Sequence, residues 1–173
     1  ISGILQPKHQ EAFFNIIKEF ENSGYQISYK LLNANDYEVP QDRLRVIIIG
    51  YRNDLEKKFE FPSPQKYKPI LKDVILGLPQ AIPTQAGNKS GNNICEIANH
   101  EYMTGGFSTI YMSRNRVRSW DEPSFTIQAG ARHAPLHPQA PKMQFIEQNK
   151  RVFVKGKEDL YRRLSVRECA RIQ

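Results

Sequence analysis

The chain has 173 residues, 39% of them hydrophobic and 25% charged, which fits one globular domain or two small ones and excludes a disordered or fibrous protein. Its longest apolar run, residues 46–49, is far shorter than the ~18 residues of a membrane-spanning helix, and no secretory leader opens it. The two cysteines lack the spacing of a disulfide-stapled secreted module. We therefore predict a cytoplasmic protein with no membrane partner, and because residue 1 is not Met we expect further sequence upstream.

Positive charge is concentrated in the C-terminal part of the chain. Residues 1–105 hold 12 basic and 12 acidic side chains, whereas residues 106–173 hold 13 basic and 6 acidic ones, which gives the net charge of +7. Nine of those 13 are arginines, whose planar guanidinium groups suit phosphate and guanine. This asymmetry is typical of a surface that binds nucleic acid, although charge alone favours a solvated basic face equally.

The first fifty residues predict a helix followed by strands. Apolar residues at three- and four-residue spacing indicate an amphipathic helix over 8–23, with Gly24 placed to end it. Alternation predicts a strand over 25–31, and Asn and Asp side chains at 33–36 predict a turn. The β-branched run 46–49 is typical of a strand buried on both faces. Together these elements predict the edge of an α/β sheet.

The rest of the chain predicts a second, less regular domain. A short helix is expected over 71–78 and a polar loop over 79–99. Ser165-x-x-Glu168 is a capping box, which predicts a helix over 166–173. Weak patterns favour short strands over 107–112, 125–129 and 151–154.

Two groups of arginines are candidates for binding. Gln41-x-Arg43-x-Arg45 precedes the apolar strand, and α/β folds place ligands at strand ends, although two surface arginines at a strand entry are the commoner explanation. A denser run at 114–120 lies in the basic segment close to aromatic residues, which suits contact with bases and phosphates and is equally compatible with a solvated charge run. The arginines of this run are Arg114, Arg116 and Arg118.

The remaining reactive side chains predict neither a metal site nor a nucleophile. Cys95, His100, His133 and His137 are all of ligating types, but no two of them have the spacing of a zinc knuckle. Cys95 has no adjacent His or Lys to lower its pKa, and Cys169 is expected on the buried side of a helix. No glycine-rich phosphate cradle occurs in the sequence.

Taken in order, two motifs resemble conserved blocks of the DNA cytosine-5 methyltransferases. The Gln41-x-Arg43-x-Arg45 segment resembles the eighth block, and residues 163–173, RLSVRECARIQ, resemble the highly specific ninth. The resemblance covers nearly the whole chain. It implies that residues 1–58 are the C-terminal part of the catalytic domain, 59–162 a target-recognition domain and 163–173 the start of the ninth-block helix. The implied fold is α/β, the edge of a Rossmann-like sheet plus a small, irregular, mixed α/β recognition domain.

Within the recognition region, residues 102–116 and 136–143 resemble the HaeIII-type subfamily, which modifies GGCC. The resemblance implies that Arg114, Arg116 and Arg132 read guanines in the major groove, where arginine donors match the O6 and N7 acceptors. It further implies that Ile110 wedges into or packs against the duplex beside the opened target. Arg43 and Arg45, with Gln41, would support the flipped cytosine. The other DNA contacts expected are Arg118, Arg163 and Arg167.

The family activity is methylation of C5 of cytosine in double-stranded DNA, with S-adenosylmethionine as methyl donor, in bacterial restriction-modification systems. The family's cofactor, Pro-Cys and Glu-Asn-Val blocks would lie upstream, and a terminal block would follow Gln173. Cys95 follows Ile94 and Cys169 follows Glu168, so neither fits the Pro-Cys nucleophile.

We therefore expect this part alone to be inactive and to bind neither cofactor nor metal. It would act on DNA as a monomer, together with a missing N-terminal catalytic portion. The alternatives are a non-catalytic DNA-binding subunit of a split methyltransferase and a degenerate relic that binds nothing specifically.

Overall fold

The computed structural model describes residues 2–85 and 95–173 and has the mixed α/β class that the sequence predicts. No helix in these residues is long and apolar enough to cross a membrane. In chain order the helices and strands are α1 (Gln10–Asn22), β1 (Tyr25–Asn33), β2 (Gln41–Asp42), β3 (Leu44–Arg52), α2 (Leu71–Ile75), β4 (Ile82–Pro83), β5 (Glu101–Tyr102), β6 (Ser124–Phe125), β7 (Gln144–Glu147), β8 (Lys150–Val152) and α3 (Val166–Ile172).

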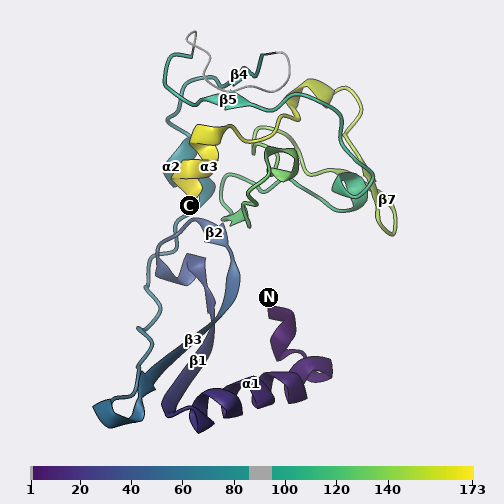
Figure 1. Ribbon diagram of the computed structural model, residues 1–173. Coiled ribbons are helices and arrows are strands. Elements are labelled where there is room, and N and C mark those ends of the chain that lie inside the picture. Colours follow the sequence, from purple (N-terminus) through teal and green to yellow (C-terminus); the bar gives the residue numbers. More distant parts are fainter. Residues whose placement is uncertain (1, 86–94) are drawn as a thin grey trace.

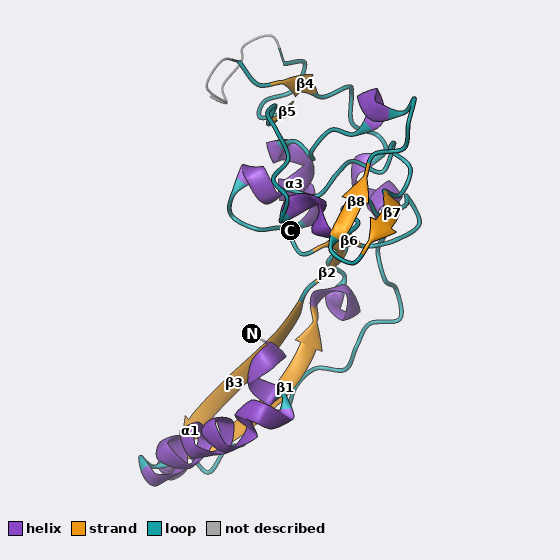
Figure 2. Cartoon of the chain, turned by 90° about the vertical axis from the view of Figure 1, so that its right-hand side faces the viewer, coloured by secondary structure: helices purple, strands orange, loops and turns teal. Residues whose placement is uncertain are grey.

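These elements form two parts, which lie end to end in Figure 1. The hairpin lobe consists of α1, β1 and β3, and the irregular lobe holds the other helices and most of the other strands (Figures 1 and 2). Among the described residues, each sheet has two strands: β1 with β3 and β7 with β8 are antiparallel, and β2 with β6 and β4 with β5 are parallel.

The hairpin lobe follows the sequence pattern closely. Helix α1 buries Phe13 and Ile17, one turn apart, and the Phe13 ring meets Tyr29 of β1 edge-on at 4.8 Å between centroids. The helix ends before Gly24, whose φ of 87° is a conformation that glycine adopts without strain. Strands β1 and β3 pair over their whole length in one unbroken register. The helix and the first strand predicted from periodicity are therefore confirmed.

The expectation that residues 46–49 are buried on both faces is wrong for this chain. Ile47 and Ile48 are each 38% exposed, because β1 is the sole strand paired with β3 in the described residues. Phe14 and Phe20 of α1 are also about half exposed. The hairpin lobe thus presents an apolar surface that no described segment of the chain covers.

The irregular lobe is held by two small cores. The helical core joins α2 to α3, with Trp120 packed at its margin, and the loop core lies beneath the segment that leads into Arg114. The buried side chains of the helical core are Leu71, Ile75, Ile127, Leu164 and Ile172. Those of the loop core are Tyr111, Val117, Leu136, Ala140, Met143 and Tyr161.

The strand predicted over 107–112 is wrong, because hydroxyl groups hold this segment in turns. The Ser108 hydroxyl accepts a hydrogen bond from the Tyr111 N–H (3.2 Å), and the Ser113 hydroxyl donates to the Ile110 carbonyl (2.8 Å). A 3-10 helix over Tyr111–Ser113 replaces the strand. Local side-chain bonds of this kind compete with a sheet ladder.

The other predicted elements differ mainly in length. Helix α2 stops at Ile75, and the strand expected over 125–129 is only the two-residue β6. Of the strand expected over 151–154, residues 151 and 152 belong to β8, which ends at Val152. The predicted polar loop 79–99 contains β4, and its residues 86–94 lie outside the described part of the chain.

Helix α3 begins at the predicted capping box. The Ser165 hydroxyl accepts the Glu168 N–H (3.1 Å), and the Glu168 carboxylate accepts the Ser165 N–H (2.7 Å). Two N–H groups at the helix start are satisfied reciprocally in this way. The cap fixes the direction of α3, which packs against α2 and lines the cleft described next.

Candidate nucleic-acid interface

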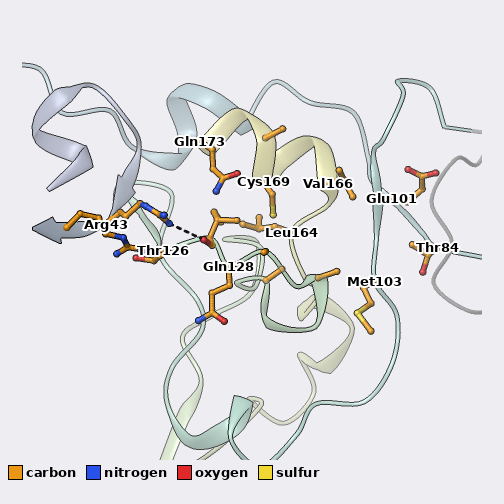
Figure 3. Close-up of a pocket in the computed structure, with 16 residues that line it drawn as sticks. Arg43, Thr84, Glu101, Met103, Thr126, Gln128, Leu164, Val166, Cys169 and Gln173 are labelled. Carbon is orange, nitrogen blue, oxygen red and sulfur yellow. Dashed lines mark hydrogen bonds between the residues drawn. The ribbon is translucent and has the colours of Figure 1, made fainter. Parts of the chain in front are cut away.

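A cleft of about 860 Å³ lies where the Gln41-x-Arg43-x-Arg45 segment meets α3 (Figure 3). Arg43 and Arg45 line one wall, and Cys169 of α3 and Gln173, which directly follows this helix, line another. The two guanidinium groups make the first wall positive, which suits an anionic ligand such as a phosphate. The complete lining is Arg43, Arg45, Thr84, Glu101, Met103, Thr126, Ile127, Gln128, Ala129, Ala131, Ala134, Leu164, Val166, Cys169, Ala170 and Gln173.

Gln41 anchors this arginine segment rather than lining the cleft. Its side chain is buried, at 1% exposure, and its amide oxygen accepts the Ile127 N–H (3.1 Å). The Thr126 hydroxyl donates to the Asp42 carbonyl (2.7 Å) beside the β2–β6 pairing. This burial makes Gln41 a support for the backbone that carries the two arginines, and its expected role in supporting the target cytosine stays a prediction.

Arg43 and Arg45 are half-buried at the edge of the cleft. One terminal nitrogen of Arg43 lies 3.5 Å from the Ile127 carbonyl, and one of Arg45 donates to the Leu44 carbonyl (2.7 Å). Neither forms an ion pair within residues 2–85 and 95–173. Each guanidinium therefore keeps donors and an uncompensated charge for a ligand in the cleft.

Arg114, Arg132 and Ile110 are the most accessible of the expected DNA contacts. Both arginines are exposed, and their guanidinium groups form no hydrogen bond or ion pair with any described residue. Arg132 lies between Ala131 and Ala134, which line the cleft. Ile110 is 73% exposed, the highest value among the exposed large apolar side chains of the described residues. These three side chains are free to meet a partner.

Arg116 lies against the turn that carries Ile110. Its Nε donates to the Tyr111 carbonyl (2.8 Å) and one terminal nitrogen to the Ile110 carbonyl (3.1 Å), while the guanidinium lies 4.8 Å from the centroid of the Tyr111 ring. Burial lowers the pKa of this guanidinium, which stays charged. Arg116 therefore holds the backbone of Ile110 and Tyr111 in place.

Arg118 and Arg167 differ in how many of their donors bond within the protein. Arg118 forms ion pairs with Asp42 (2.7 Å) and Glu122 (3.1 Å), whereas Arg167 donates to the Ala98 carbonyl (3.0 Å) through its Nε. Both side chains are half-buried. The geometry supports an internal role for Arg118, and the DNA contact expected of Arg167 stays a prediction.

Arg163 is a buried structural residue, at 1% exposure, which does not fit the expected DNA contact. Its three nitrogens donate to the carbonyls of Gly105 (3.1 Å), Gly106 (2.9 Å) and Arg132 (3.2 Å). Its guanidinium also lies 4.0 Å from the centroid of the Phe107 ring. One side chain thus fixes both the start of the segment that leads to Ile110 and the backbone of Arg132.

A buried ion pair joins α3 to the segment before it. Arg162 donates two hydrogen bonds to the Glu168 carboxylate, at 2.8 and 2.7 Å, and the His137 ring lies 3.5 Å from the same carboxylate. Burial alone raises the pKa of Glu168, but the hydrogen bonds and charge of Arg162 lower it below its usual value. Burial, together with the charge of Arg162, lowers the pKa of His137 to about 4.

We expect the free energy of unfolding to fall as the pH decreases from about 7 to about 4, because unfolded His137 takes up a proton near pH 6.5 and folded His137 does not. The folded pKa is lowered, so this stability is present above the unfolded pKa and is lost as the pH falls towards the folded one. The difference between the unfolded and folded pKa of His137 corresponds to about 3 kcal/mol of the free energy of unfolding. Urea titrations of wild type and His137→Gln should show a flatter pH profile for the variant between pH 7 and 5. Identical slopes would contradict the assignment.

Both cysteines of the chain have thiols with a raised pKa. Cys169 lines the cleft, but burial raises the pKa of its thiol to about 12. Burial and the negative charge of Glu101 also raise the pKa of Cys95. A thiol with a raised pKa has too little thiolate for attack at neutral pH.

Two of the candidate metal ligands, His100 and His137, take part in other interactions. The ring of His100 is hydrogen-bonded to the Ser165 hydroxyl (2.8 Å) and to the Pro79 carbonyl (2.7 Å), and His137 lies against Glu168. Within the described ranges, no three His, Cys, Asp or Glu side chains are placed to hold a metal ion.

The cleft does not fit S-adenosylmethionine, the cofactor that the resemblance implies. The reactive sulfur of this molecule is positively charged, whereas the lining holds the two guanidinium groups of Arg43 and Arg45 and a single carboxylate, Glu101, which already has a partner. We therefore derive no catalytic step through the cofactor.

Sequence reasoning missed three residues that shape the interface. Asp42 fills the variable position of the Gln-x-Arg-x-Arg segment, Glu122 pairs with Arg118, and Arg162 pairs with Glu168. Only the pair of Arg118 and Glu122, four residues apart, has a local spacing that could have been recognised as an ion pair.

The cleft with Arg43 and Arg45 on its wall, together with the exposed and unpaired guanidinium groups of Arg114 and Arg132, is the kind of basic surface that nucleic-acid-binding proteins present. The chain belongs to the C-5 cytosine-specific DNA methylase family, whose sequence model matches residues 1–173. It is 56% identical over 173 residues to Type II methyltransferase M.MthTI of Methanothermobacter thermautotrophicus and 54% identical over 177 residues to M.FnuDI of Fusobacterium nucleatum. Type II methyltransferase M.NgoPII of Neisseria gonorrhoeae is 49% identical over 178 residues. All of this chain is covered in each comparison, and it spans 52% of each relative.

Proposed function

We propose that this chain is the DNA-binding and target-recognition part of a DNA (cytosine-5) methyltransferase of a restriction-modification system. The whole enzyme would methylate C5 of cytosine in double-stranded DNA, within GGCC, in the cytoplasm, with S-adenosylmethionine as methyl donor. The observation that carries the proposal is the pair of exposed, unpaired guanidinium groups of Arg114 and Arg132, one of them beside the cleft of Arg43 and Arg45. Family membership supports the same conclusion.

In this proposal Arg114 and Arg132 read guanines in the major groove. A guanidinium presents two parallel N–H donors to the O6 and N7 acceptors of guanine, and each such contact discriminates against other bases by ~1–3 kcal/mol. Arg116 holds the turn that carries Ile110, and it adds a base contact through its remaining donors. Ile110, exposed at the end of that turn, packs against or between base pairs next to the opened site.

Arg43 and Arg45 would receive the displaced cytosine or its phosphate. A base on which an enzyme acts is rotated out of the duplex into a pocket, and the phosphate beside it needs a positive partner there. The arginine-lined cleft meets this requirement. Both cysteines of this chain have a raised thiol pKa and neither follows a proline, so we assign the nucleophile to a separate catalytic portion. The family resemblance assigns the cofactor site to the same portion.

The proposed arrangement keeps the divisions implied by the resemblance. Residues 1–58 form the edge of the catalytic sheet, 59–162 the target-recognition domain and 163–173 the first turns of the ninth-block helix. The exposed apolar surface of the hairpin lobe supports this, because a larger sheet would cover it. The catalytic portion supplies that sheet, either in the same polypeptide or as a partner subunit, and we call the combination the assembled enzyme.

Arg114→Ala and Arg132→Ala should each weaken binding of the assembled enzyme to a GGCC duplex by roughly 10- to 100-fold, the loss of one bidentate base contact. Binding to a duplex with the same bases in shuffled order should weaken by less than about threefold. Fluorescence anisotropy across a salt series measures both, because phosphate contacts alone lose affinity steeply with salt. Arg52→Ala, which removes an exposed arginine of the hairpin lobe, is the matched control.

Two outcomes would count against the proposal. Equal weakening on both duplexes would make Arg114 and Arg132 phosphate contacts without sequence specificity. Failure of the assembled wild-type enzyme to transfer a methyl group to any cytosine-containing duplex would overturn the activity itself.

A further inference from the structure

One ion pair joins the Gln41-x-Arg43-x-Arg45 segment at the cleft to the arginine run at residues 114–118. Asp42 lies between Gln41 and Arg43, and its Oδ2 accepts a hydrogen bond from Arg118 at 2.7 Å. Its other carboxylate oxygen accepts the side-chain N–H of Asn33 (3.2 Å). Both oxygens of Asp42 are thus engaged, and each bond reaches a different element of the fold.

Arg118 is held rigidly at the other end of the pair. Its second terminal nitrogen bonds Glu122 at 3.1 Å, and its guanidinium lies 4.3 Å from the centroid of the Phe125 ring. The preceding residue, Val117, is buried and bridges to Leu136. An arginine with two carboxylate partners and an aromatic face has little freedom to move independently of them.

Each member of the pair is close in sequence to arginines that the proposed function places on DNA. Asp42 directly precedes Arg43, whereas Arg118 follows Arg114 and Arg116 by four and two residues. The side chains of Arg118 and Asp42 are 25% and 38% exposed, so solvent screens their attraction less than that of a fully exposed pair. The pair is therefore a direct side-chain link between residues 114–118 and the segment that carries the cleft arginines.

We propose that the Asp42–Arg118 pair is a positioning device that couples recognition of the bases to placement of the target cytosine. This inference rests on the proposed function. Correct docking of Arg114 on its base fixes Arg118, which fixes Asp42 and thereby Arg43 and Arg45 at the cleft. Neither member of the pair contacts the substrate, so both are positioning residues. The pair gives the enzyme a physical reason to transfer the methyl group faster on the correct sequence.

Asp42→Asn and Arg118→Gln test the coupling in the assembled enzyme by single-turnover methyl transfer to a GGCC duplex at saturating S-adenosylmethionine. We expect the rate constant to fall about tenfold in each variant. The amplitude should be unchanged and the dissociation constant for the duplex should stay within threefold. The double variant should be no slower than the slower single one, because both remove the same interaction. Arg118→Lys, which keeps the charge opposite Asp42, should recover most of the rate.

Asp121→Asn is the control, since it breaks the 2.6 Å ion pair with Lys72 in the same lobe without touching the arginine segment. Its rate constant should match that of wild type. A lower amplitude with an unchanged rate constant would show that the pair only maintains the fold, because fewer molecules would then be active at the normal rate. Weaker duplex binding with an unchanged rate constant would instead make Arg118 a DNA contact.

Additive effects in the double variant would also overturn the coupling. A wild-type enzyme that methylates no duplex would overturn the proposed function together with this inference. An active wild type with unaffected Asp42 and Arg118 variants would overturn the coupling alone.

Discussion

Replacing Arg163 with alanine is expected to lower the free energy of unfolding by about 3–5 kcal/mol, the range seen when a buried charged group with several partners is lost. The truncation removes three hydrogen bonds to the carbonyls of Gly105, Gly106 and Arg132, together with the stacking on Phe107. Solvent has little access to this position to replace them, because Arg163 is 1% exposed and packs within the irregular lobe. The loss should loosen both segments that carry the proposed base contacts.

Urea unfolding of the 173-residue chain, followed by the fluorescence of its single tryptophan, measures this effect. Trp120 packs against the helical core and reports on the irregular lobe directly. Arg163→Lys keeps the charge but has one donor head, so we expect it to be intermediate. Arg171→Ala, at an exposed position on α3, should change stability by less than about 0.5 kcal/mol. A loss below 1 kcal/mol in Arg163→Ala would mean that solvent can satisfy the three carbonyls.

The sequence predicted best those elements that depend on near neighbours. Helix α1 follows from the spacing of Phe13 and Ile17, and α3 follows from Ser165 and Glu168, three residues apart. A weak pattern predicts a strand over residues 107–112, whereas the hydroxyls of Ser108 and of the following Ser113 hold the segment in turns. Periodicity describes which side of an element is buried, and it is uninformative where side chains bond the local backbone.

The candidate interface shows the same limit at longer range. Arg114 and Arg163 are chemically identical and both lie in the basic part of the chain, yet one is exposed and the other buried. What separates them is their partners, and the partner of Arg163 at Gly105 is 58 positions away. Arg118 pairs with Asp42 across 76 positions. Charge composition indicated a basic surface, but only the fold decides which arginines belong to it.

The hairpin lobe is the reverse case, in which the sequence predicts more burial than the chain provides. The run 46–49 has the β-branched composition of a central strand, yet Ile47 and Ile48 are each 38% exposed. The β-branched composition of a strand reflects how deeply it is buried in the whole folded protein. Its exposed fraction in this structure depends only on the segments of this chain that cover it. The disagreement is therefore an argument for a covering sheet, and it is the part of the proposal that does not depend on the arginines.

Glu168→Ala is the second substitution with a large expected effect, about 3–5 kcal/mol of lost stability. It leaves the guanidinium of Arg162 buried without its carboxylate, and it removes one half of the capping box of α3. Trp120 fluorescence in urea measures the loss, because α3 packs in the same core. Glu158→Ala, at an exposed carboxylate, is the control and should lie within about 0.5 kcal/mol of wild type.

The charge of Glu168 can be separated from its packing by its pH dependence. Its folded pKa is lowered, so its contribution is present above the unfolded pKa, near 4.5, and is lost as the pH falls below that value. Glu168→Gln should therefore be less stable than wild type at pH 7, and the gap should narrow as the pH approaches 3. The double variant Arg162→Met, Glu168→Leu should be much less destabilised than Glu168→Ala, because no unpaired charge remains buried. If it were equally destabilised, the cost would come from the lost cap and packing rather than from the orphaned guanidinium.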